Sequence, residues 1–297
     1  MINNKNFQLR KILTNKNETS FLMEAHNGIS AKIVEDVGFQ AIWASGFAIS
    51  SSLALRDCNE NSWTQTLDIL EYMADAVNIP ILLDGDTGYG NFNNFRRLIY
   101  KLEQRGISGV CIEDKVFPKL NSFVEQKDRL AQVEEFCGKI KAGKDVQKDK
   151  NFTIVARVES LVSGLPIEEA LMRSEAYFKA GADAILIHSK KETGDEILEF
   201  VKKCPVDIPL IIVPTKYYKT PTSLFKKAQI AAIIWANQSF RAAYASMKKT
   251  LQEIFHTESL QNTEPHITSM SEIFNILHYD ELKVAEEKYL PKIIKES

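Results

Sequence analysis

The amino-acid sequence predicts an α/β protein, a (β/α)8 barrel of the TIM type with extra C-terminal helices over residues 240–297. Two observations favour this fold. Eight short apolar runs recur along the chain, and segments with helical spacing of apolar residues separate them. Near-continuous apolar strands are typical of a parallel sheet that is buried on both faces. An open doubly wound sheet is the alternative, and it differs by a reversal of strand order that a sequence does not show.

The expected strands are bounded by turn residues and cover residues 20–26, 41–45, 79–86, 109–114, 152–160, 182–189, 208–215 and 230–237. Helical patterns between them include residues 93–106, 167–181 and 194–204. Three repeated phrases, at residues 37–46, 105–114 and 180–189, each place a glycine at the end of a helix, one turn before an apolar strand. Because such barrels reach about 250 residues as one unit, we expect residues 1–297 to form a single domain.

The tail adds one or two helices over residues 269–290, whose apolar residues need a partner surface on the same barrel or on a neighbouring subunit. A lysine-rich stretch, residues 138–150, contains acids and lacks the aromatic residues of a nucleic-acid site, so we interpret it as the solvated end of a helix.

Composition excludes several classes of function. The net charge of −2 provides no basic field for nucleic acid or an anionic membrane. No run of about 18 apolar residues and no apolar leader occurs, so we expect a protein that is neither secreted nor membrane-spanning. The four cysteines lie far apart without a C-x-x-C pair, which fits a reducing cytoplasm better than a zinc ribbon or a disulfide framework.

Polar residues gather at the ends of the expected strands, where the active sites of such barrels lie. The residues collected there, together with those of the adjoining loops, are Trp43, Ser45, Gly46, Asp57, Asp84, Asp86, Glu113, Asp114, Lys115, Lys119, Arg157, Glu159, His188 and Ser189. Four of the acids, Asp57, Asp84, Asp86 and Glu113, share one rim without a thiolate or histidine cluster, a set that favours Mg²⁺ or Mn²⁺ over zinc. In isolation, the D-x-D pair of Asp84 and Asp86 is more often a solvated turn. Here it ends an apolar strand and precedes the glycine-bearing loop "TGYG", so we favour a metal site.

Two cationic or titratable residues stand at other strand ends. Arg157 interrupts an apolar strand and needs an anionic partner, either a substrate or a carboxylate such as Glu159. His188 is equally consistent with a packed core histidine and with a ligand-binding group. The remaining histidines show no ligand spacing, and we expect them to be structural or surface residues.

The segment "EDKVFPKLNS", residues 113–122, resembles the E-D-K-x5-N-S motif of the phosphoenolpyruvate mutases in the isocitrate lyase superfamily. The likeness extends along the chain through "WASGFAISSSLALRDCNE", "LLDGDTGYGNFNN", "ARVES" and "ILIHS". The lyases of the superfamily carry a K-[KR]-C-G-H segment in the equivalent loop, and this sequence has none.

The resemblance implies a role for each matching residue. Asp84 would contact Mg²⁺ directly, and Asp57, Asp86 and Glu113 would hold its waters. Ser45, Gly46 and Phe47 would receive the substrate carboxylate, partly through backbone N–H groups, with Trp43 nearby; many relatives carry leucine where Phe47 stands. Arg157, His188, Asn121 and Ser122 would hold the phosphoryl group, and Lys119 would belong to the loop that closes over it.

The resemblance also implies an activity, the interconversion of phosphoenolpyruvate and phosphonopyruvate through pyruvate enolate and a metaphosphate-like group. Asp57 would serve in positioning and in the metal shell, because a dissociative path needs no nucleophile. Phosphonopyruvate hydrolase is the main alternative, although Asn121 favours the mutase. A Mg²⁺-dependent carbon–carbon lyase or acylhydrolase and a non-catalytic metabolite-binding barrel are further alternatives. The family likeness suggests a homotetramer, a dimer of dimers, with exchanged C-terminal helices.

Overall fold

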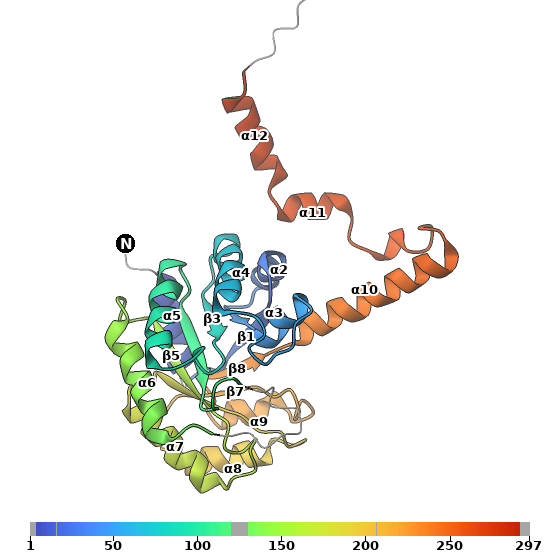
Figure 1. Cartoon of the computed structure of the whole chain (residues 1–297). Helices are drawn as coiled ribbons and strands as arrows, with labels where there is room; N and C mark the ends of the chain where they lie inside the picture. The colour runs from blue at the N-terminus through green and yellow to red at the C-terminus, as the bar shows by residue number, and fades with distance from the viewer. Residues whose placement is uncertain (1–3, 16, 120–129, 206, 292–297) are drawn as a thin grey trace, which may run out of the picture. The chain divides into compact units, whose positions relative to one another are not determined.

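A computed structural model describes residues 4–15, 17–119, 130–205 and 207–291 of the chain. Eight parallel strands close into a barrel in sequence order, with β1 paired to both β2 and β8 (Figure 1). The strands are β1 Ser20–Ala25, β2 Ala41–Ala44, β3 Ile81–Asp84, β4 Gly109–Glu113, β5 Thr153–Val158, β6 Ala184–Ile187, β7 Leu210–Ile212 and β8 Ala232–Trp235. The closed barrel confirms the predicted fold and rules out the open sheet.

Helices alternate with the strands and cover the outside of the barrel (Figure 1). Those of the barrel are α1 Asn4–Thr14, α2 Gly28–Val37, α3 Gly46–Ser52, α4 Trp63–Ala76, α5 Phe92–Gln104, α6 Val133–Val146, α7 Ile167–Lys179, α8 Asp195–Lys203 and α9 Thr222–Lys227. They are followed by α10 Gln238–Thr257, the short 3-10 turn η1 Glu264–His266, α11 Met270–Ile276 and α12 Tyr279–Tyr289. The tail therefore contains the two short helices that its pattern allowed.

The three glycines of the repeated phrases all adopt left-handed backbone conformations, with φ of 101° at Gly38, 69° at Gly106 and 110° at Gly181. A side chain at such a position is disfavoured, so glycine ends the helix at low cost and turns the chain toward the next strand. The predicted helix-to-strand joints are confirmed.

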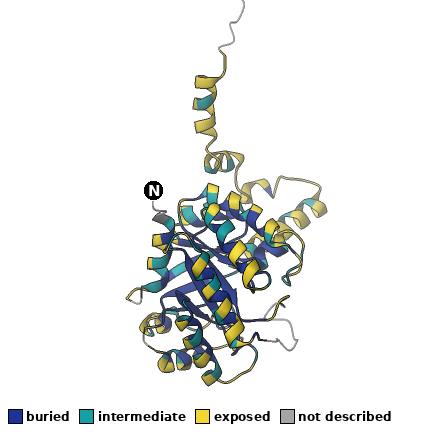
Figure 2. Ribbon diagram, turned by 60° about the vertical axis from the view of Figure 1, so that its left-hand side comes forward, coloured by how far each residue is buried: buried dark blue, intermediate teal, exposed yellow. Residues whose placement is uncertain are grey.

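The core has two layers, and the strands contribute to both. One cluster fills the barrel interior and includes Leu22, Trp43, Leu82, Cys111 and Val155. The other lies between the strands and the surrounding helices, whose outer faces are exposed (Figure 2). Side chains alternate along a strand, so the interior positions continue at every second residue toward the carboxyl ends of the strands. The site described below occupies this continuation.

One lysine of residues 138–150, the stretch that we interpreted as a solvated helix end, is buried. Lys139 in α6 is only 5% exposed, and its Nζ donates a hydrogen bond to the backbone oxygen of Thr87 at 2.7 Å. Burial lowers the pKa of Lys139. The helical spacing puts this lysine on the inner face of α6, whereas our interpretation of the stretch rested on its charge alone.

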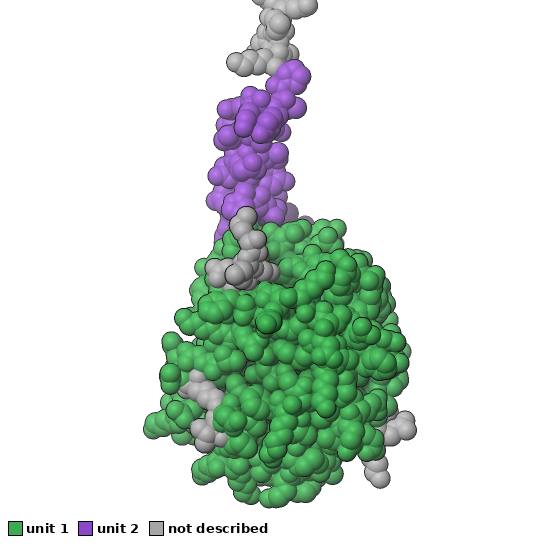
Figure 3. All heavy atoms as spheres, turned by 90° about the vertical axis from the view of Figure 1, so that its left-hand side faces the viewer, with its two compact units in different colours: residues 1–241 green, residues 242–297 purple. Residues whose placement is uncertain are grey.

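The chain divides into two compact units, residues 1–241 and residues 242–297 (Figure 3). The first contains the whole barrel. The second contains most of α10, with α11 and α12, and the single-domain expectation stays a prediction. Within the part of the chain that the structure describes, no helix has the length and apolarity needed to cross a lipid bilayer.

Candidate active site

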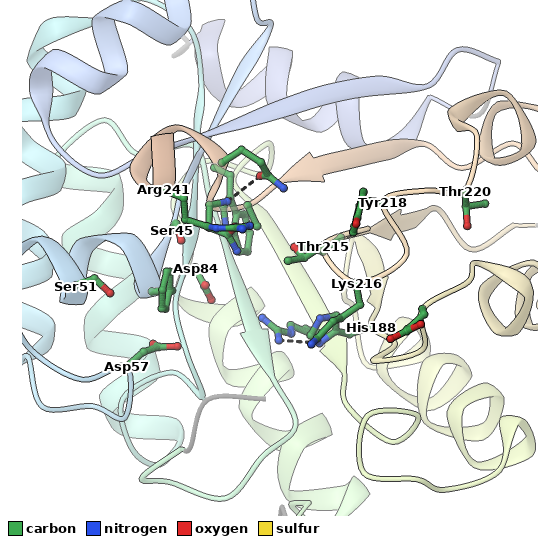
Figure 4. A pocket seen from close by; sticks show the side chains of 18 of the residues that line it. Ser45, Ser51, Asp57, Asp84, His188, Thr215, Lys216, Tyr218, Thr220 and Arg241 are labelled. Carbon is green, nitrogen blue, oxygen red and sulfur yellow. Dashed lines mark hydrogen bonds between the residues drawn. The ribbon is translucent and has the colours of Figure 1, made fainter. Parts of the chain in front are cut away.

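A cavity of about 1650 Å³ opens at the carboxyl ends of the strands. Its walls include eight residues predicted from the sequence, which are Trp43, Ser45, Phe47, Asp57, Asp84, Lys119, Arg157 and His188. Figure 4 shows that Asp57 and Asp84 lie toward one side of the cavity and His188 toward another. Trp43, Asp84, Arg157 and His188 all stand at or just beyond strand ends, so barrel closure brings together residues that are far apart in sequence.

The loop after β3 presents two carboxylates from a tight backbone. Asp84 is the last residue of β3. Asp86 lies two residues later and has a φ of 51°. Tyr89, in the same loop, has a φ of 56°. Left-handed conformations cost about 1 kcal/mol or more for residues with a side chain, so surrounding contacts must hold this loop in shape. The buried ammonium of Lys139, bonded to Thr87, is one such contact.

Lys119 lies between two of these acids. Its Nζ is 2.8 Å from Oδ1 of Asp57 and 2.8 Å from Oδ1 of Asp86. Burial opposes the charge of Lys119, yet the surrounding carboxylates raise its pKa well above the ordinary value. Asn59 supports the arrangement, because its side chain donates to Asp86 Oδ2 at 2.7 Å and accepts from the Lys119 backbone N–H at 2.8 Å.

Arg157 and His188 form a second group, joined by Glu159. Nη2 of Arg157 lies 2.9 Å from Nδ1 of His188, and the same ring nitrogen lies 2.9 Å from Glu159 Oε1. Arg157 Nε donates to Glu159 as well. Burial lowers the pKa of His188, although Glu159 opposes the shift. Arg157 is thus paired with Glu159, the carboxylate partner that the sequence suggested, and it also lines the cavity. Its contact with an anionic substrate stays a prediction.

Glu113, the last residue of β4, is 2% exposed, and its Oε2 lies 3.5 Å from Arg157 Nε. Among the described residues, its Oε1 is one of the buried oxygens that accept no hydrogen bond. Burial raises the pKa of Glu113 to about 7 and that of Asp86 to about 6. A buried carboxylate oxygen without a donor, beside other acids, suits a cation with its water shell. The residues present therefore fit the implied Mg²⁺.

The described side chains contain no cluster of three or more His, Cys, Asp or Glu that could hold a metal ion by itself. The expected arrangement, in which Asp84 alone contacts the ion directly and Asp57, Asp86 and Glu113 act through water, stays a prediction.

The segment after β2 begins α3 directly at the cavity. Ser45 is the N-cap of α3, and its hydroxyl accepts the backbone N–H of Ala48 at 3.2 Å. The Gly46 N–H donates to Asp84 Oδ2 at 3.3 Å. A Cβ at Gly46 would lie 3.2 Å from Asp86 Oδ1, so the lack of a side chain lets the backbone approach the acids closely. The start of α3 therefore lies directly beside the acids, and its expected role toward a substrate carboxylate stays a prediction.

Two predicted residues, Asn121 and Ser122, lie outside the described residues. Part of the cavity wall was not predicted. It follows the ends of β7 and β8 and includes Thr215, Lys216 and Arg241 (Figure 4), together with Asn237. The rule used for the second to sixth strands, taking the polar residues just beyond each strand end, would have found Thr215, Lys216 and Asn237, whereas Arg241 lies in the first turns of α10.

Comparisons with known proteins show the family of the chain. The family model described as phosphoenolpyruvate phosphomutase matches residues 9–255. The chain belongs to the phosphoenolpyruvate phosphomutase family. It is 52% identical over 287 residues to the phosphoenolpyruvate phosphomutase of Tetrahymena pyriformis, covering 96% of this chain and 95% of the relative.

Two solved structures share the barrel of this family member. A phosphoenolpyruvate phosphomutase from Streptomyces platensis subsp. rosaceus superimposes with a TM-score of 0.94 at 37% identity, covering 96% of this chain and 99% of the other. A phosphonopyruvate hydrolase in complex with oxalate and Mg²⁺ superimposes with a TM-score of 0.91 at 36% identity, covering 97% and 99%. The resemblance seen in the sequence motifs is confirmed at the level of family and fold.

Proposed function

We propose that this protein is an isomerase that interconverts phosphoenolpyruvate and phosphonopyruvate. The observation that carries the proposal is that one cavity is lined by the acids Asp57 and Asp84 and also by Arg157 and His188, two groups that can hold an anion. A substrate with a carboxylate end and a phosphorus end fits such a cavity. The relative at 52% identity is named a phosphomutase, whereas the similar hydrolase structure is 36% identical.

The side of the cavity that carries Asp57 and Asp84 is the proposed place for a divalent metal, Mg²⁺ with Mn²⁺ as a substitute. Asp84 would bind it directly, and Asp57, Asp86 and Glu113 would hold its waters. When bound, the metal supplies a Lewis acid that stabilises negative charge on the substrate oxygens. The unsatisfied Oε1 of Glu113 supports this assignment, as does the Mg²⁺ in the hydrolase relative.

The chain's own residues divide the remaining work. Ser45, Gly46 and Phe47 would receive the substrate carboxylate, partly through backbone N–H groups, and Trp43 would pack nearby. Arg157 and His188, with Asn121 and Ser122, would hold the phosphoryl group as its bond to oxygen breaks and a bond to C3 forms. Charge spread over a loose phosphoryl group needs donors and cations rather than a nucleophile, so Asp57 keeps a positioning role. Lys119 would help to exclude water.

The alternatives make different demands on the same site. A hydrolase would admit water to the phosphoryl group, and release of phosphate would reveal it. A carbon–carbon lyase or acylhydrolase is disfavoured because the K-[KR]-C-G-H segment is absent from the sequence. A non-catalytic barrel is disfavoured because all four acids, Asp57, Asp84, Asp86 and Glu113, are present.

We also propose a cytoplasmic homo-oligomer, a dimer of dimers. The four cysteines are free thiols, as a reducing compartment favours. In the second unit, Tyr244, Met247, Leu251 and Phe255 line one shallow apolar face and are all more than half exposed. Such a face favours a protein partner, and we infer a second copy of the chain. Light scattering of the wild type against Leu251→Glu tests this, and a wild-type monomer would contradict it.

Phosphorus NMR tests the function directly. Purified protein with phosphonopyruvate and Mg²⁺ should form phosphoenolpyruvate, and a chelator should abolish the reaction. Release of inorganic phosphate together with pyruvate would instead identify a hydrolase. An unchanged spectrum would contradict both activities and favour the lyase or the non-catalytic binding protein instead.

A further inference from the structure

Glu24 is a buried acid that the proposed reaction does not use. It lies in β1, in register with Trp43 of β2, and is fully buried. By strand alternation from Leu22, its side chain belongs to the interior positions that elsewhere supply the site. A carboxyl group at this depth requires hydrogen-bond donors on both oxygens. The donors to Glu24 show which segments of the chain it connects.

Two of these donors, Ser239 and Phe240, come from the segment that follows the last strand of the barrel. Glu24 Oε2 accepts the backbone N–H of Phe240 at 2.9 Å and also accepts the hydroxyl of Ser239. Oε1 lies 2.7 Å from Nδ1 of His26. The Ser239 hydroxyl lies 3.1 Å from the backbone oxygen of Glu24 as well. Because α10 begins at Gln238, Glu24 acts as the N-terminal cap of that helix from more than 200 residues away.

The capped turn reaches the proposed carboxylate-binding segment through an aromatic contact. The ring of Phe240 lies 5.1 Å from that of His26 and 6.2 Å from that of Phe47, in both cases edge to face, at 87° and 89°. Phe47 directly follows Gly46, whose N–H lies beside Asp84. Movement of the first turn of α10 would therefore remove the support behind the Ser45–Phe47 segment.

We propose that Glu24 is a positioning residue for the active site. It fixes the first turn of α10, and through Phe240 and Phe47 it holds the Ser45–Phe47 segment in place beside the cavity, where the proposed function puts the substrate carboxylate. The same turn carries Gln238 and Arg241 of the cavity wall, so Glu24 also sets the place of that wall. The inference rests on the proposed function for its substrate, but its structural part can be tested without turnover.

The main test compares Glu24→Gln with a matched control, Asp183→Asn. Asp183 is also a buried acid that accepts a backbone N–H, that of Ile154 at 2.8 Å, and it pairs with Arg10 and Lys144. It precedes β6, so it stands at the opposite end of the barrel from the cavity. Both variants lose one buried charge, but only Glu24→Gln should loosen residues 45–52.

Hydrogen exchange read by mass spectrometry measures that effect directly. We expect exchange of the peptide covering residues 45–52 to be about tenfold faster in Glu24→Gln than in the wild type and unchanged in Asp183→Asn. Calorimetry with oxalate and Mg²⁺ should show an oxalate Kd about tenfold weaker in Glu24→Gln alone. In turnover, the KM should rise by a similar factor while kcat changes by less than about threefold.

Unchanged exchange in Glu24→Gln, or equal changes in Asp183→Asn, would overturn the proposal. If Glu24→Gln does not fold, Ser239→Ala removes one donor and should show a smaller change of the same kind. Phe47→Leu and Phe240→Leu, alone and combined, test the aromatic contact. The change in oxalate Kd of the double variant should differ by about threefold from the product of the two single changes. If the wild type turns over neither substrate, the proposed function fails while the exchange result still decides the role of Glu24.

Discussion

The ammonium of Lys119 lies 2.8 Å from the carboxylate of Asp57, and both side chains are almost fully buried beside the cavity. The two residues come from different loops, after β2 and after β4, so the pair ties one side of the cavity rim to another. The same ammonium contacts Asp86, so it partly neutralises two carboxylates that would otherwise interact with a bound metal ion. This relationship leads to the first of four predictions.

Lys119→Met should reduce turnover by about 100-fold or more, because a cationic group and a barrier to water are lost from the site. The same variant should bind Mg²⁺ at least as tightly as the wild type, since Asp57 and Asp86 no longer have the ammonium as a competing partner. Phosphorus NMR and calorimetry measure the two effects. Lys141→Met, an exposed lysine on α6, is the control and should leave both unchanged. Weaker Mg²⁺ binding in Lys119→Met would contradict the competition.

Asp84→Ala should abolish Mg²⁺-dependent turnover while the fold survives. Burial raises the pKa of Asp84, so the carboxylate costs stability until a cation binds it. We therefore expect Mg²⁺ to raise the melting temperature of the wild type but not that of Asp84→Ala. Differential scanning calorimetry with and without chelator measures this. A variant that keeps its activity would remove the metal assignment.

Lys139→Met should weaken Mg²⁺ binding by about tenfold, because the loop that carries Asp84 and Asp86 loses its buried support at Thr87. The pH dependence of unfolding offers a second measurement. Burial lowers the pKa of Lys139 in the folded state, so the unfolded chain binds more protons between that pKa and about 10.4. The lysine's contribution therefore becomes more favourable as pH rises through this window. Over this pH window the free energy of unfolding of the wild type should increase relative to that of Lys139→Met. A difference between the two proteins that does not change with pH would contradict the lowered pKa.

Asn121→Ala should lower turnover by about tenfold or more and affect folding less than turnover, since the resemblance gives this residue a contact with the phosphoryl group. The fraction of substrate released as phosphate should rise at the same time, because a less tightly held phosphoryl group is more open to water. Phosphorus NMR separates the two products in one experiment. Wild-type rates in the variant would refute the role of Asn121.

The strands, the helix-to-strand joints and eight of the residues that line the cavity were predictable because each depends on local pattern. Apolar runs define the strands, and Gly38, Gly106 and Gly181 end helices whatever surrounds them. Asp84, Glu113, Arg157 and His188 follow from a single rule, that polar residues at strand ends of a barrel share one rim. Lys139 shows where this reasoning fails, since its charge suggested solvent while its helix face dictated burial.

By itself, the sequence determined the barrel, its family and the rim to which the chemistry belongs, since strand periodicity and short motifs are properties of neighbouring residues. Only the tertiary structure decided which donor meets which acceptor. Lys119 bridges Asp57 and Asp86, Glu159 joins Arg157 to His188, and Glu24 caps a helix that begins 214 residues later. The physical reason is that barrel closure fixes distances between strand ends, and hydrogen bonds and ion pairs depend on those distances to within a fraction of an ångström.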